Sequence, residues 1–186
     1  MPNRENPGTA ASDDPALPPL PSPERIQELL FDAARIGRSD VIPALLQAGA
    51  NIEQLDKAGH SALILASYHG HVEAVTLLLD HGAPVDQGDG SRGNTALMGA
   101  VFKGHQFVAD ILLGAGAGPA TRNRAGQTAL MMAALFGRCA IVDRLLASGA
   151  DPFAQDAAGN SAITVAQEQG NELMVARLSG RPRIHA

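Results

Sequence analysis

Aromatic residues are scarce in this chain: its 186 residues include five Phe, one Tyr and no Trp, although 45% of the residues are hydrophobic. That apolar content is enough for a folded domain with a real core. A core so poor in rings must consist of Leu, Val, Ile, Ala and Met. These smaller side chains suit thin layers of closely packed short helices better than a thick sandwich of sheets.

Three further features are missing. The single cysteine, Cys139, excludes an internal disulfide and is typical of a reducing compartment. No stretch reaches the roughly 18 to 20 apolar residues needed to span a bilayer, and residues 1–25 contain no apolar run typical of a signal peptide. The net charge of −5 gives no overall attraction to nucleic acid. We therefore expect a cytoplasmic protein whose partners include neither membranes nor nucleic acids.

Proline is concentrated at the start of the chain: six of the twelve prolines lie in residues 1–22. This composition predicts a disordered segment. Pro18 and Pro21 have the P-x-x-P spacing of polyproline-helix ligands, but no basic residue lies beside them, so a plain linker is the favoured interpretation. Ordered structure is predicted to begin at residues 22–24. Ser22 suits a helix N-cap, Pro23 suits the first helical position, and Glu24 is an acidic residue in the first turn. Residues 181–186 are predicted to form a tail.

The dominant signal is a period of about 33 residues. One row of glycines recurs with steps of 33, 34, 33 and 33 residues: Gly37, Gly70, Gly104, Gly137 and Gly170. Two more rows keep the same steps, namely the glycines Gly49, Gly82, Gly116 and Gly149 and the leucine pairs that begin at Leu45, Leu78, Leu112 and Leu145. Several independent markers in one register indicate a repeat protein.

Each repeat is predicted to be a pair of short helices. Residues 61–67 have the pattern of an amphipathic helix, and residues 71–80 have that of a second one. Glycine follows each helix, at Gly70 and Gly82, which fits a left-handed C-terminal cap. The turn-rich stretch 83–90 leads to the next repeat. One such unit leaves its apolar face exposed to water, whereas stacked units cover it.

These residues resemble the ankyrin repeat. The matching residues are Asp56, Gly59, Ser61-Ala62-Leu63, Gly70-His71 and Gly82-Ala83, and the pattern returns in phase at Thr95-Ala96-Leu97 and Thr128-Ala129-Leu130. The resemblance covers about residues 23–180. It implies an all-α solenoid of helix-turn-helix units with protruding turns. We predict about five repeats, including two caps, with the bounds 23–55, 56–88, 89–122, 123–155 and 156–180.

The chain departs from the family pattern at two positions of each repeat. The family's Pro is replaced by Ala62, Ala96, Ala129 and Ala162, and its His by Ile64, Met98, Met131 and Thr164. The resemblance therefore implies that the hydrogen bonds this His makes between turns are missing and that apolar packing substitutes. The run from Thr128 to Gly137 is similar to that of small bacterial ankyrin proteins, some of which are associated with catalases.

One stretch, Gly88–Gly93, matches the G-x-G-x-x-G fingerprint of dinucleotide-binding proteins letter for letter. A functional fingerprint needs a buried strand before the glycines and a βαβ unit around them. The preceding residues 83–86 are a turn by repeat register. An elongated turn is therefore the favoured interpretation, and a nucleotide-binding enzyme is the alternative from another class.

The histidines and the cysteine give little sign of catalysis or metal binding. His69, His71 and His81 have no Glu or Cys at a spacing typical of zinc. His71 and His105 occupy the Gly-His position of the repeat, where we expect the ring to cap or pack locally. Cys139 has no apparent base partner and is expected to be a small packing residue. We therefore predict no catalytic residue, no metal and no cofactor.

The resemblance implies that partners contact the turn tips and first helices, which form a concave face. The two residues before each glycine of the first row should lie there, and three of the six aromatic residues occupy that row. Such rings are typical of interface anchors, although packing against the neighbouring repeat is the alternative. The candidate binding residues are Arg35, Ile36, Lys57, Tyr68, His69, Arg92, Phe102, Lys103, Arg124, Gln127, Leu135 and Phe136.

Charge gives a second indication about the partner. Basic residues fall at the turn tips and in this row, whereas the second helices are acidic and have few basic residues. The leading hypothesis is a monomeric, non-enzymatic scaffold that binds a protein with an acidic patch through its concave face. An accessory or protective protein for an enzyme such as a catalase is the second hypothesis, and the nucleotide-binding enzyme that uses residues 88–93 is the third.

Overall fold

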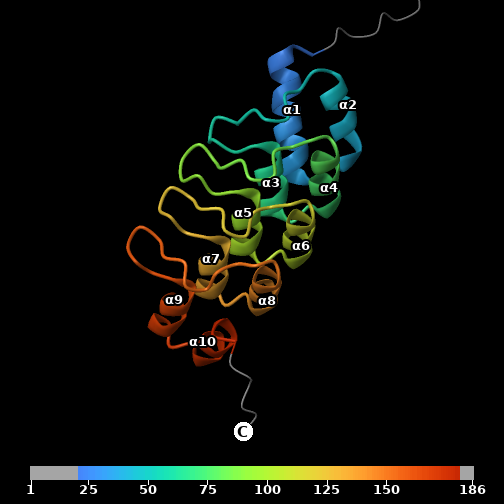
Figure 1. Cartoon of the computed structure of the whole chain (residues 1–186). Coiled ribbons are helices and arrows are strands. Elements are labelled where there is room, and N and C mark those ends of the chain that lie inside the picture. Colours follow the sequence, from blue (N-terminus) through green and yellow to red (C-terminus); the bar gives the residue numbers. More distant parts are fainter. Residues whose placement is uncertain (1–20, 181–186) are drawn as a thin grey trace, which may run out of the picture.

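The computed structural model describes residues 21–180, in which five pairs of antiparallel helices stack in chain order (Figure 1). A long turn joins each pair to the next, and the turns project from the same side of the stack. The disordered segment predicted for residues 1–22 and the tail predicted for residues 181–186 lie outside the described residues, apart from residues 21 and 22. No helix between residues 21 and 180 is both long and apolar enough to cross a bilayer.

Two layers of helices make up the stack. The inner layer, next to the turns, consists of α1 (Pro23–Ile36), α3 (Ala62–His69), α5 (Ala96–Lys103), α7 (Ala129–Leu135) and α9 (Ala162–Glu168). The outer layer consists of α2 (Ile42–Gln47), which follows the 3-10 turn η1 (Ser39–Val41), and of α4 (Val72–Asp80), α6 (Gln106–Gly114), α8 (Cys139–Ala147) and α10 (Glu172–Leu178). The predicted all-α repeat solenoid is confirmed for the described residues.

Short polar side chains start the inner helices. Ser22 caps α1 as predicted, and its hydroxyl accepts a hydrogen bond from the backbone N–H of Arg25. The hydroxyls of Ser61, Thr95, Thr128 and Ser161 do the same at the other inner helices. Each cap satisfies one of the N–H groups that a helix start leaves without a partner. The helix predicted over 61–67 therefore begins one residue later, at Ala62.

Glycine ends α3 for two reasons. Gly70 has φ 79°, a left-handed conformation that strains residues with a Cβ. A Cβ there would also lie 2.7 Å from the ring of His105 in the next repeat. The recurring glycine thus both turns the chain between the two helices and leaves room for the neighbouring repeat.

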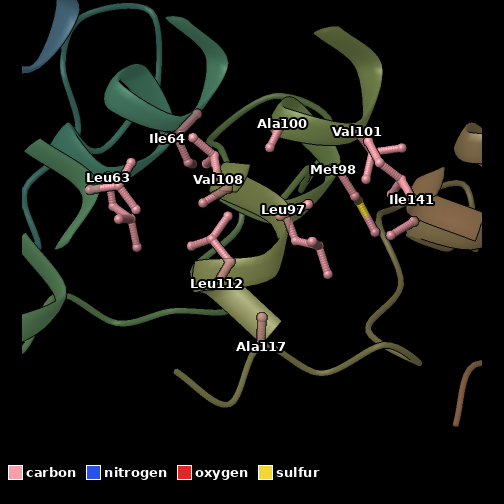
Figure 2. Close-up of a cluster of buried hydrophobic side chains, with 14 of the residues drawn as sticks. Leu63, Ile64, Leu97, Met98, Ala100, Val101, Val108, Leu112, Ala117 and Ile141 are labelled. Atoms are coloured by element: carbon pink, nitrogen blue, oxygen red, sulfur yellow. The ribbon is translucent and has the colours of Figure 1, made fainter. Parts of the chain in front are cut away.

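The hydrophobic core lies between the two layers and runs through the stack (Figure 2). Helix α3 packs against α1 on one side and α5 on the other. Leu63 and Leu97 of the inner layer and Leu112 of the outer layer are at most 2% exposed. Burying each such side chain contributes about 1.5–3 kcal/mol, which explains why a chain with so few aromatic residues can fold. Ile64, Met98 and Met131, at the family's His position, are buried too.

Backbone hydrogen bonds join the turn tips as well. The N–H of Gly90 donates to Gly59 O at 2.8 Å, and that of Arg124 donates to Arg92 O at 2.8 Å. The same bond recurs from Ala157 to Ala125 O in the next turn. The expectation that apolar packing alone replaces the histidine hydrogen bonds is therefore incomplete, because the main chain also connects the turns.

Side chains at the Gly-His position tie each repeat to the preceding one. The ring Nε2 of His71 lies 3.0 Å from Arg35 O, that of His105 lies 3.1 Å from Tyr68 O, and Nη2 of Arg138 donates to Phe102 O at 3.1 Å. The expectation of a local cap was wrong for His71 and His105, because the acceptor is a carbonyl of the neighbouring repeat. In the last repeat Asn171 does cap locally, accepting from the N–H of Met174.

Candidate protein-binding groove

A groove of about 740 Å³ lies between the protruding turns and the inner helices, the side predicted to be concave. Its floor consists of apolar side chains from three consecutive inner helices and one helical glycine: Ile64, Leu65, Met98, Gly99 and Met132. The turns that precede α3 and α5 form one wall. Because inner helices and turns both repeat, neighbouring units continue one surface across the stack.

An aromatic strip, formed by Tyr68, Phe102 and Phe136, runs along the other side of the groove. The ring centroids of Tyr68 and Phe102 are 6.1 Å apart and nearly parallel, and those of Phe102 and Phe136 are 4.9 Å apart and edge to face. The three residues nevertheless keep 37%, 42% and 40% of their surface exposed. The rings therefore contact one another across the joints between repeats and still present a continuous apolar surface to solvent.

Backbone N–H groups of the G-x-G-x-x-G stretch are hydrogen-bonded to an aspartate within the stretch, Asp89. The backbone N–H groups of residues 91–94 donate to the Asp89 carboxylate at 2.5–3.2 Å. Burial by itself would raise the pKa of Asp89, but the hydrogen bonds from Arg92 N–H and from the N–H and hydroxyl of Ser91 outweigh it and hold the pKa below its ordinary value. The carboxylate occupies the N–H groups that a phosphate would need, and α5 follows a turn, not a strand.

The acidic side chains around the groove have partners within the protein. Arg35 pairs with Asp32 at 2.8 Å and with Asp56 at 3.2 Å. In contrast, Arg92 and Lys103 are exposed and form no ion pair with any residue between 21 and 180. The Lys103 ammonium lies 5.1 Å from the centroid of the Tyr68 ring, a cation–π contact. The charges that this part of the molecule offers to a partner are therefore positive.

His69 lines the groove beside Tyr68 of the aromatic strip. Its ring makes an edge contact with Tyr68 and stacks on His71 at 6.0 Å between centroids. Partial burial lowers the pKa of His69, and the neighbouring His71, Arg35, Lys103 and His105 lower it further by charge repulsion. The ring is therefore neutral at pH 7 and adds no charge to the groove.

Most of the residues predicted to bind a partner line this groove: Arg35, Tyr68, His69, Arg92, Phe102, Gln127, Leu135 and Phe136. Four do not. Ile36 is 66% exposed and does not line the groove, and Lys103 lies over the Tyr68 ring of the aromatic strip. Arg124 donates to Ser91 O of the neighbouring turn. Lys57 lines a separate hollow of about 660 Å³ beside α1.

Sequence reasoning missed the groove floor. Leu65, Gly99 and Met132 occupy equivalent positions of consecutive repeats, separated by the same steps of 34 and 33 residues as the glycine rows. The repeat period therefore contained a signal for this row. Spacing alone does not distinguish this row from the buried rows beside it, because exposure to the groove depends on how the inner helices pack.

The outer face has two ion pairs between neighbouring repeats and corrects one prediction. Asp110 pairs with Arg144 at 3.1 Å, and Asp143 pairs with Arg177. Cys139, expected to be a packing residue, is exposed at the start of α8. Between residues 21 and 180, no group of three or more His, Cys, Asp or Glu side chains is arranged to hold a metal ion.

Comparison with known proteins identifies the repeat. A family model described as ankyrin repeats (3 copies) matches residues 30–123, and one described as ankyrin repeats (many copies) matches residues 112–166. A putative ankyrin repeat-containing protein of Treponema pallidum is 40% identical over 86 residues, which cover 46% of this chain and 29% of that protein. The Drosophila melanogaster ankyrin repeat and KH domain-containing protein mask is 36% identical over 89 residues, 47% of this chain and 2% of that protein.

A probable E3 ubiquitin-protein ligase of Oryza sativa subsp. japonica is 35% identical over 99 residues, 52% of this chain and 19% of that protein. The chain thus spans less than a third of the length of these relatives. Ankyrin repeats are in general protein–protein interaction modules. With half of its residues matched by one ankyrin model and the following repeats by another, the chain belongs to the ankyrin repeat family.

Proposed function

We propose that this protein is a non-enzymatic scaffold that binds a partner protein in the groove between its turns and inner helices. The observation that carries the proposal is the aromatic strip, whose three rings stay about two-fifths exposed although they lie in a concave site. Large rings of this kind, placed where a partner can exclude water from them, are the usual energetic centres of protein interfaces.

The partner offers an acidic patch beside its apolar side chains. Arg92 and Lys103 lack ion-pair partners within residues 21–180, whereas Asp56 pairs with Arg35 and Asp89 accepts hydrogen bonds from the backbone of its own turn. A cationic ligand is disfavoured because Lys103 takes the position over the Tyr68 ring where such a ligand would bind. We further propose a monomer that acts in the cytoplasm, and the net charge of −5 argues against nucleic acid as a partner.

Capture of the partner tests the proposal. The purified chain serves as bait in cross-linking affinity capture with quantitative mass spectrometry, next to the variant Tyr68→Ala/Phe102→Ala/Phe136→Ala. A matched control removes three exposed apolar side chains elsewhere: Phe107→Ala/Phe153→Ala/Leu173→Ala.

A specific partner should be lost with the groove variant and kept with the control, while circular dichroism shows both variants folded. Equal recovery with wild type and groove variant would refute the groove as the binding site. Equal loss with both variants would refute it too.

A further inference from the structure

We infer that the segment received by this groove is an acidic amphipathic α-helix of the partner protein. The inference rests on the proposed function and deepens it, because it assigns a conformation and a side-chain pattern to the bound segment. Four features of the groove carry it: its width, the spacing of the aromatic strip, a gap in its floor and the positions of its cations.

The width of the groove fits one helix. Its floor follows α5 from the N-cap Thr95, on the turn side, to Phe102 in the aromatic strip. Seven residues of helix at 1.5 Å each make a floor of about 10 Å, and a helix with its side chains is about 10–12 Å across. A single extended strand would leave part of this floor exposed to water.

The aromatic strip has the spacing of a helical ridge. Its ring centroids are separated by 6.1 Å from Tyr68 to Phe102 and by 4.9 Å from Phe102 to Phe136. Along a helix, residues i and i+4 are separated by a rise of about 6.0 Å, and residues i+4 and i+7 by about 4.5 Å. Alternate residues of a strand are about 6.6 Å apart, longer than either step. The apolar positions of a helix therefore keep register with all three rings.

The floor has a gap at Gly99, in the interior of α5. A glycine there destabilises a helix relative to alanine. Packing does not require it, because a Cβ at this position would meet its nearest neighbour, the Tyr68 Cβ, at an ordinary 3.8 Å. The equivalent positions carry Leu65 and Met132, whose side chains line the groove on either side. The gap is therefore a recess between two larger side chains, where one apolar residue of a docked helix can insert.

The cations stand at both ends of the α5 floor. Arg92 lies in the turn before the helix, and Lys103 is its last residue. A helix lying across the floor would pass between them, with its apolar stripe down and its two flanks facing one cation each. Acidic residues on both flanks satisfy this arrangement, and lysines in the same places would face like charges.

Synthetic peptides test the inference directly. The first probe is a peptide of about 18 residues, roughly 27 Å as a helix, with Leu at i, i+4, i+7 and i+11 and with Glu on both flanks. The second has the same composition but places Leu at alternate positions, and the third replaces every Glu of the first by Lys. Fluorescence anisotropy measures the Kd of each for the full chain, and circular dichroism follows peptide helicity.

We expect the first peptide to bind at least about tenfold more tightly than the other two, and its helicity to rise on binding. The inference is overturned if the alternating peptide binds as tightly as the first, or if the first does not bind.

A variant that fills the recess gives a second test. Gly99→Gln should weaken binding of the first peptide at least about tenfold while the melting temperature stays equal or rises, because glutamine is the better helix former. The matched control is Gly114→Gln in outer helix α6, where a Cβ meets nothing within 4 Å, and its Kd should equal that of wild type. Unchanged affinity in Gly99→Gln would overturn the inference.

The two proposals can fail separately. If the partner is lost with the aromatic variant but the helical peptide shows no preference, the groove still binds protein and the helix assignment is wrong. If the aromatic variant captures the partner as well as wild type does, the proposed function itself is wrong.

Discussion

The two faces of the stack use charge differently. On the outer face the arginines Arg144 and Arg177 pair with aspartates of the preceding repeat, so their charge contributes to the joints between repeats. On the groove face Arg92 and Lys103 form no ion pair within residues 21–180, while the aspartates of the turns accept hydrogen bonds from their own backbone. One repeat period thus builds an outer face whose arginines pair across the joints between repeats and a groove face that retains positive charge and apolar surface for a partner.

The largest expected effect comes from a substitution in the hydrophobic core, which lies beneath both faces. Leu97→Ala leaves a cavity where the inner and outer layers meet, because the side chain is 1% exposed. We expect a loss of about 2–5 kcal/mol of unfolding free energy. Urea denaturation followed by circular dichroism measures it, with Phe107→Ala on the exposed outer surface as the control that changes stability by less than about 0.5 kcal/mol. A loss no larger than that of the control would contradict the described core.

Charge reversal on the groove face sharpens the contrast. Arg92→Glu/Lys103→Glu should weaken binding of the captured partner by about 1–3 kcal/mol with stability nearly unchanged, because these cations have no internal partner. Titration calorimetry at two salt concentrations measures the effect, and the affinity of the wild type should fall as salt rises. Affinity that is indifferent to both the substitutions and salt would remove the electrostatic half of the proposal.

Acid should weaken the groove turn through Asp89. Its pKa is lowered in the folded protein, so its contribution to stability is present above the ordinary carboxyl pKa of about 3.9 and is lost as pH falls through the lower folded value. Asp89→Asn should cost about 1 kcal/mol at neutral pH, since the amide oxygen is a weaker acceptor. The difference in melting temperature between the variant and wild type should shrink below pH 4; a constant difference would contradict this role.

The smallest effect belongs to the outer face. Arg144→Gln/Arg177→Gln removes both outer ion pairs, and because the Arg144 and Asp143 side chains are more than half exposed we expect at most about 1 kcal/mol in stability. Partner affinity should not change, which is the reverse of the groove variant. Denaturation and calorimetry on the same samples make the comparison. A drop in affinity comparable to that of Arg92→Glu/Lys103→Glu would show that the two faces do not divide their tasks.

Local and periodic features were predictable from the sequence. The cap at Ser22, the glycine after α3 and the rows of buried leucines depend on a residue and its near neighbours, so spacing alone located them. The hydrogen bond from His71 to Arg35 O was not predictable, because its acceptor is fixed only when one repeat settles on another. The recess at Gly99 was missed for a related reason: its significance depends on the larger side chains of two other helices.

Site-specific photo-cross-linking can show whether the partner lies in the groove. Phe102 and Phe107 are exposed phenylalanines five residues apart, the first in the groove and the second on outer helix α6. A benzophenone amino acid at either position keeps an aromatic ring there and forms a covalent bond with whatever protein lies against it. We expect the captured partner to cross-link through position 102 and not through position 107. A partner that cross-links through position 107 alone, or equally through both, would contradict this expectation.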